Sequence, residues 1–151
     1  MTRTTRVPEV MARILELLTA KTDSTTQQVL DGPTVSGEYK DTVILIGYRP
    51  DAKEDVVVTR TQKGLGANDQ EFFTVGFLIN AVDATGSVSG ARQKAADALA
   101  VLEGILTTDD PTLGIGDGIL TRLSDHSWRA IPTPKGIEQT VSGLIVGEAV
   151  L

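Results

Sequence analysis

The feature that most constrains the fold is a long alternation of side chains over residues 71–82. Apolar residues take every second position and a mixed series lies between them, the two series being Phe73, Val75, Phe77, Ile79 and Thr74, Gly76, Leu78, Asn80. Side chains of a β-strand point alternately to the two sides of a sheet, so this period predicts one long strand with an apolar face. All three phenylalanines of the chain lie here, and we interpret them as core residues.

Two other segments have the spacing of amphipathic helices. Residues 7–20 form the first, with Pro8 in the first turn, where proline is tolerated. The second follows a loop at residues 83–90 in which Ser87 or Ser89 can serve as N-cap. Its apolar positions are Ala91, Ala95, Ala98, Leu99, Leu102, Ile105 and Leu106. Alanine on the early face of this helix predicts that it lies flat across a sheet.

The remaining apolar runs predict further strands. A short strand ends at Val29 and Leu30, before the turn residues Asp31, Gly32 and Pro33. Residues 42–48 are almost all β-branched or aliphatic, which favours a strand covered on both faces and makes it the candidate for the centre of the sheet. A more exposed strand is expected at residues 55–61, and three more at residues 119–123, 127–131 and 137–146, the last two divided by Pro132 and Pro134.

Helix, strands, helix and strands in this order predict an α+β fold, a mainly antiparallel β-sheet packed against two principal α-helices. The length of 151 residues fits a single domain over residues 1–151. With 40% apolar and 23% charged residues, the composition is that of a globular protein. The sequence contains no linker, repeat or low-complexity tract.

Composition also excludes several classes of function. The chain has no cysteine, which excludes disulfides, thiolate metal sites and a cysteine nucleophile. Its formal net charge of −6 argues against binding to nucleic acid or to anionic membrane, because both require a basic surface. The apolar run after the basic residues 1–6 is broken by charges, and no run is long enough to span a bilayer. We therefore expect a protein of an aqueous compartment, without a signal peptide.

Two loops carry residues with possible chemistry. The only histidine, His126, stands beside Ser124, Asp125 and Ser127, but a catalytic triad requires groups that converge from separate elements. We interpret this segment as a turn and keep a hydrolase built on Asp125 and His126 as an alternative.

The second loop, at residues 107–118, carries Asp109, Asp110 and Asp117. Their oxygens suit Ca²⁺ or Mg²⁺, although their spacing is not that of an EF-hand. A small-ligand or metal-binding α+β module is therefore another alternative. The glycines at residues 64–66 and 114–118 do not complete a phosphate-binding pattern. We expect no catalytic residue, no metal site and no cofactor.

Two regions are candidates for contacts between copies of the chain. Residues 63–70 are polar and glycine-rich and predict a protruding hairpin loop between two strands. Trp128 is interpreted as a half-buried core residue, with an interface role beside Arg129 as the alternative, since tryptophan and arginine are enriched at binding hot spots. The candidate oligomer-interface residues are Lys63, Leu65, Asn68, Asp69, Trp128 and Arg129.

Four segments together resemble the tail-terminator proteins, also called tail-completion or minor tail proteins, of long-tailed double-stranded DNA phages. They are the opening helix VPEVMARILELL, the VLDGP turn before DTVILIGY, the strand and helix FFTVGFLINAVDATGSVSGARQKAADALAVLEGIL, and the closing VSGLIVGEAVL. The likeness spans nearly the whole chain. It departs from the family at residues 80–83, where relatives often have an aromatic residue.

The resemblance implies a structural protein rather than an enzyme. Such a subunit forms a homo-oligomeric ring, commonly a hexamer, that ends the tail tube at its head-proximal end and helps to join the tail to the head. Its partners would be the tail-tube protein and the head-tail connector proteins, with DNA passing through the ring without specific binding. It would be assembled in the host cytoplasm and located in the virion tail. A neck or head-completion connector protein is the alternative within the same setting.

Overall fold

The structure, a computed structural model, describes residues 4–33, 39–61, 69–116 and 118–151. Helices and strands follow one another along the chain as α1 (Val7–Lys21), β1 (Gln27–Asp31), β2 (Thr42–Ile46), β3 (Val56–Thr61), β4 (Gln70–Asp83), α2 (Val88–Glu103), the π-helix η1 (Gly104–Asp109), β5 (Leu120–Thr133) and β6 (Gly136–Val150). The two predicted helices and the strands up to β4 are therefore confirmed, with small shifts at their ends.

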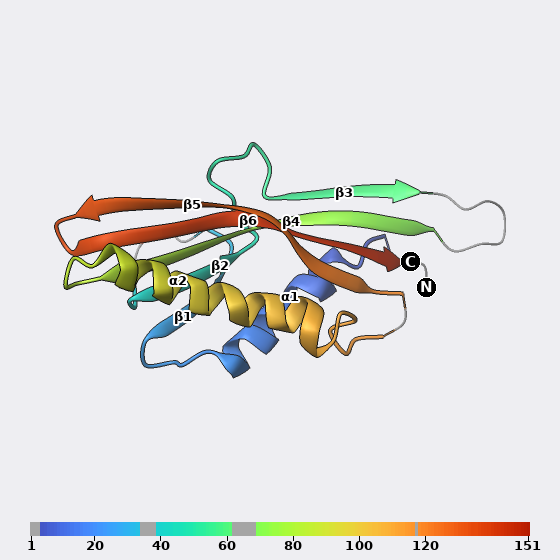
Figure 1. The fold of residues 1–151 in the computed structure, drawn as a ribbon. Coiled ribbons are helices and arrows are strands. Elements are labelled where there is room, and N and C mark those ends of the chain that lie inside the picture. The colour runs from blue at the N-terminus through green and yellow to red at the C-terminus, as the bar shows by residue number, and fades with distance from the viewer. Residues whose placement is uncertain (1–3, 34–38, 62–68, 117) are drawn as a thin grey trace.

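The strands form one six-stranded sheet in the order β1-β2-β4-β6-β5, with β3 also paired to β4 (Figure 1). Strand β6 pairs with the whole length of β4 along one edge. Strands β2 and β3 therefore share the other edge, β2 opposite residues 77–81 and β3 opposite residues 70–75. Only β1 and β2 run parallel, which confirms the predicted α+β fold with a mainly antiparallel sheet. Strand β2 is buried throughout, as expected, but β4 and not β2 is at the centre.

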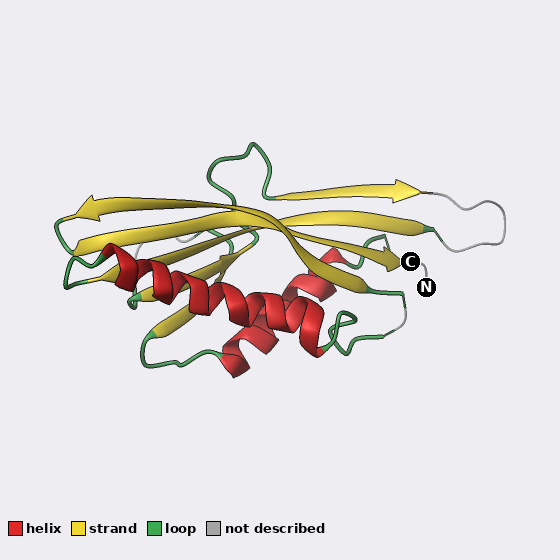
Figure 2. Ribbon diagram, in the orientation of Figure 1, coloured by secondary structure: helices red, strands yellow, loops and turns green. Residues whose placement is uncertain are grey.

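Both helices lie on the same face of the sheet (Figure 2). We call this the closed face and the opposite one the open face. Fully buried side chains from α1 and from the alanine-rich start of α2 pack here against alternate residues of β4; they include Val10, Ile14, Leu18, Ala91, Ala95, Ala98, Val75, Phe77 and Ile79. The small alanines allow α2 to lie flat on the sheet, as the sequence predicts.

The helix starts are fixed in two different ways. Ser87 caps α2 by accepting a hydrogen bond from the Gly90 backbone N–H at 2.9 Å, which confirms one of the two predicted caps. The N-cap residue of α1, Arg6, makes no such side-chain hydrogen bond. Instead, the buried Glu71 of β4 accepts a hydrogen bond at 2.6 Å from the N–H of Arg6, so the sheet and the start of α1 are tied together.

Two predictions about β5 are wrong, whereas Pro134 lies in the turn between β5 and β6, as predicted. Strand β5 is continuous where two strands and a turn at His126 were expected, because a β-bulge between Leu123 and His126 absorbs the irregularity. Gly143 of β6 makes the bulge possible, since a Cβ at this position would lie 2.9 Å from Cβ of His126. Pro132 lies inside β5, opposite Ile137. It is tolerated there because β5 is an edge strand and one side of its backbone needs no partner.

The C-terminal end of the second helix also differs from the prediction. Helix α2 ends at Glu103, and the chain continues as η1, which buries Ile105 and Leu106. The loop predicted at residues 107–118 therefore begins at Asp110, three residues later than expected. None of the helices in the described part of the chain is both long and apolar enough to cross a membrane.

Candidate assembly surface

The open face of the sheet exposes side chains that a globular core would bury. Phe72 and Phe73 are neighbours in β4, yet Phe72 is 43% exposed and Phe73 only 2%. Phe72 belongs to the alternate positions that point away from the helices. The prediction that all three phenylalanines are core residues is therefore wrong for Phe72. Exposed aromatic and aliphatic side chains that gather in one place mark surfaces for binding other molecules.

A groove of about 470 Å³ runs over the open face where β3, β4, β6 and β5 lie side by side. We call it the open-face groove. Cross-strand register places its open-face lining in two rows, Thr59, Phe72, Glu148, Leu120 and Val57, Thr74, Val146, Arg122, with the row Phe73, Gly147, Thr121 between them. Its floor is mostly apolar, with one acidic and one basic side chain. This composition suits another protein surface better than a phosphate or a metal ion.

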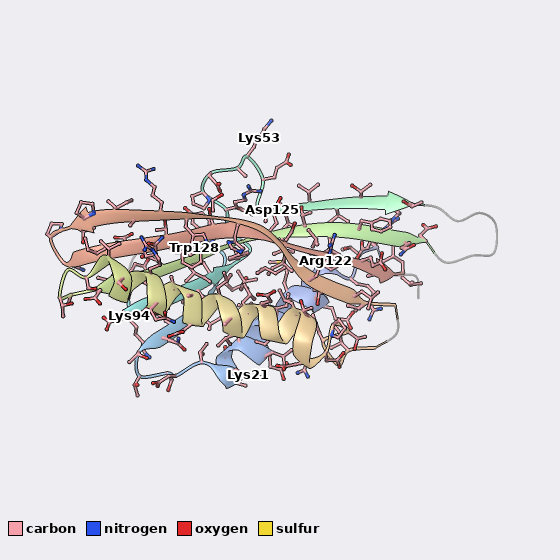
Figure 3. The ribbon with its side chains drawn as sticks, in the orientation of Figure 1. Lys21, Lys53, Lys94, Arg122, Asp125 and Trp128 are labelled. Atoms are coloured by element: carbon pink, nitrogen blue, oxygen red, sulfur yellow. The ribbon has the colours of Figure 1, made fainter. Side chains whose placement is uncertain are left out.

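Trp128 lies at the opposite side of the sheet from β3, on the edge strand β5 (Figure 3). Its side chain is 38% exposed and borders a hollow of about 330 Å³ that is otherwise lined by Ser89, Arg92, Gln93 and Ala96 of α2. The indole Nε1 donates a hydrogen bond to Nδ1 of His126 at 2.8 Å. Trp128 does not belong to the core cluster, so the core part of the interpretation is wrong, whereas a side chain that is 38% exposed is half-buried, as predicted.

The other candidate interface residues are only partly placed. Arg129 is exposed and follows Trp128 in β5, so the two side chains point to opposite faces. Asp69 precedes β4, and its backbone oxygen accepts a hydrogen bond from the N–H of Leu151 at 2.9 Å. Cross-strand register places Trp128 level with Ile79 of β4. Asp69 therefore lies far from Trp128 along the strand direction. Lys63, Leu65 and Asn68 lie outside the described residues, as does most of the predicted hairpin loop.

Two aspartates of the loop considered as an alternative cation site have partners within the protein. Oδ1 of Asp110 accepts hydrogen bonds from the backbone N–H and the hydroxyl of Thr112, at 2.9 and 2.6 Å. The hydroxyl and then the N–H of Thr112 lower the pKa of Asp110. Asp109 forms an ion pair with Lys21, and Asp117 lies outside the described residues. In the described segments, no three His, Asp or Glu side chains gather as metal ligands would.

The segment around His126 does not bring a nucleophile and a base together. Nδ1 of His126 accepts the hydrogen bond from the indole of Trp128. Within the described residues, His126 has no hydrogen bond with Ser124, Asp125 or Ser127. An activated serine would require such a bond to its base. The chemistry of this segment is therefore that of an edge strand with an exposed aromatic pair, whose ring centroids are 6.0 Å apart.

Sequence reasoning missed the open-face groove. The groove is formed by single residues from four strands, and no continuous motif marks it. The one available signal was the pair Phe72 and Phe73, because two adjacent aromatic residues in a strand must point to opposite faces.

No protein-family model and no curated protein matches the sequence. Among solved structures, the chain is similar to a chain of the structure described as the virion of a native gene transfer agent particle. The two share 13% sequence identity and a TM-score of 0.58, and the match covers 99% of this chain and 100% of the other. At this identity the likeness is one of fold, and it extends over essentially the whole of both chains.

Proposed function

We propose that this protein is a structural component of a phage-like virion, and that it acts there as a tail terminator. The observation that carries the proposal is the fold match from end to end with a chain of a gene transfer agent particle. The resemblance of four sequence segments to tail-terminator proteins supports the same assignment independently. In this role the chain forms a ring, six copies in the form common to the family, that caps the head-proximal end of the tail tube.

The surface of the molecule supports a role in assembly. A ring requires a head-to-tail contact, in which one patch of each copy binds a different patch of the next. The open-face groove and the exposed edge of β5 provide two such different patches on one chain. The partners beyond the ring would be the tail-tube protein on one side and head-tail connector proteins on the other.

The proposal does not require catalysis or a cofactor. We propose that the chain is not an enzyme and that the hydrogen bonds around His126 and Asp110 serve structure. The formal net charge of −6 fits a ring through which DNA passes without binding, because like charges repel.

Particles assembled with and without this protein would test the proposal. A tail terminator stops growth of the tube, so its absence should give tails of unregulated length that are not joined to heads, as seen by electron microscopy. Tails of normal length that fail to join heads would favour the neck or head-completion alternative. Particles of normal form and infectivity would contradict a virion role. Light scattering and electron microscopy of the purified chain should show a closed ring.

A further inference from the structure

Strand β3 has an open edge with none of the usual protection. Among the residues that the structure describes, it pairs only with β4, and all of its residues from Val57 to Thr61 are exposed. Its sequence VVVTRT is β-branched at five of six positions and contains no proline or bulge. Such an edge presents free backbone N–H and C=O groups and is a template for another strand. Its single charge, Arg60, is held by a hydrogen bond to the backbone oxygen of Thr4.

The edge of β5 is interrupted at two points, with one uninterrupted stretch between them. In the described part of the chain, this strand pairs only with β6. The bulge between Leu123 and His126 interrupts it at one point, and Pro132, which has no N–H, interrupts it at another. Between these lie residues 126–131, which we call the β5 window. All of the window is exposed, and its length equals that of the six-residue β3.

We infer that β3 of one copy pairs with the β5 window of a second copy and so joins the two sheets. Four of the exposed large apolar side chains of the described residues belong to β3 and the β5 window, namely Val57, Val58, Trp128 and Ile131. Pairing would cover them together with the free backbone groups. The inference rests on the proposed function, because it names the contact by which the ring forms.

The direction of the strands fits this contact. Strand β3 is antiparallel to β4, β4 to β6, and β6 to β5. Strands β3 and β5 therefore run in opposite directions, and a neighbour's β5 beside β3 continues the antiparallel pattern. Because the two edges belong to different strands, the contact is head-to-tail. A row of joined copies therefore keeps a free β3 edge at one end and a free β5 edge at the other until the row closes into a ring.

The two faces of the sheet restrict the possible registers, and we infer the one that pairs the exposed apolar residues Val57 and Ile131. Opposed residues of an antiparallel pair point to the same face, so residues of the open face must meet residues of the open face. Val57 and Ile131 are both open-face residues, since their register partners are Thr74 and Glu138. Pairing them also places Val58 opposite Ala130 on the closed face. Arg60 then lies opposite Trp128, and both residues belong to the closed face.

The absence of cysteine from the chain allows a direct test by cross-linking. A Val58→Cys chain mixed with an Ala130→Cys chain should form a disulfide-linked dimer under mild oxidation. The matched control replaces Ala130→Cys by Arg129→Cys, which is adjacent and also exposed but points to the other face. Strands β3 and β5 of one chain are separated by β4 and β6, about 14 Å at the usual strand spacing, too far for a disulfide within a chain.

The chain carrying both Val58→Cys and Ala130→Cys should give a ladder of linked species on a denaturing gel, ending at the number of copies in the ring. The emission of Trp128, the only tryptophan, should shift to shorter wavelength as the wild-type chain assembles. Wild-type rings without the Val58–Ala130 cross-link, or with equal cross-linking to Arg129→Cys, would overturn the inference and leave the proposed function intact. A wild-type chain that forms no assembly at any concentration or salt would overturn both.

Discussion

Phe73 and Phe72 are adjacent in one strand and have different roles. Phe73 is packed under the helices on the closed face, whereas Phe72 borders the groove on the open face. The difference shows how one β-strand serves both folding and recognition. Alternate side chains of β4 and β6 determine whether the chain folds, and the residues between them determine which surface it presents. Substitutions on the closed face and on the open face can each test this division.

The largest effect is expected from Phe73→Ala. The side chain is 2% exposed and belongs to the main core cluster, so its removal leaves a cavity and should lower the free energy of unfolding by about 3–5 kcal/mol. Urea denaturation followed by circular dichroism would measure the change. A loss below about 1 kcal/mol would mean that the closed face is not the true core.

A smaller loss is expected from Gly147→Ala, also on the closed face. A Cβ at Gly147 would lie 2.7 Å from Cε2 of Phe73, so the ring must move, at a cost of about 1–3 kcal/mol. Gly104→Ala is the matched control, because a Cβ there meets no atom within 4 Å. Equal denaturation midpoints for the two variants would contradict the close packing of β6 on Phe73.

A pH-dependent effect is expected at Asp83, where β4 ends. The hydroxyl and then the backbone N–H of Thr85 hold the pKa of Asp83 below its ordinary value of 3.8. The folded pKa is therefore lower than the unfolded one, so this interaction stabilises the fold above the unfolded value and is lost as the pH falls through the folded value. Thr85→Val should lower stability equally at pH 7 and pH 5, and less at pH 3.

Denaturation midpoints at the three pH values would measure this effect, with Thr85→Ser as a control that retains the hydroxyl. A difference between wild type and Thr85→Val that is as large at pH 3 as at pH 7 would show that the lost interaction does not involve the charge of Asp83.

The smallest effect on stability is expected from Phe72→Ala. The ring is partly in solvent, so the free energy of unfolding should change by no more than about 0.5 kcal/mol. Light scattering should nevertheless show weaker self-association if the open-face groove takes part in assembly. A loss of stability comparable with that of Phe73→Ala would remove the distinction between the two faces.

Local patterns predicted much of the fold. The spacing of apolar residues was sufficient for α1, for β4 and for the alanine-rich start of α2, because each of these elements is defined within its own segment. The bulge in β5 could not be found in this way. It depends on Gly143, which stands opposite in β6 and has no mark in the sequence around His126. The place of Pro132 inside a strand likewise depends on β5 being at the edge of the sheet.

The candidate site was predicted less well than the fold. Trp128 and Arg129 were proposed as interface residues from their types alone, and both are exposed. Whether they form an interface stays a prediction. The open-face groove and the free edge of β3 were not predicted, because exposure depends on which strands become neighbours. A sequence that shows a β-branched strand does not show whether another strand will cover it.

The sharing of one edge of β4 by β2 and β3 has a practical consequence. Between these strands the chain leaves the sheet in a short excursion, and residues 51–55 of it are exposed (Figures 1 and 3). Its ends are fixed by hydrogen bonds between Gly76 and the flanking residues Gly47 and Asp55. A peptide tag inserted beside Lys53 should thus leave the core untouched. It would provide a label by which single copies can be located inside an intact particle.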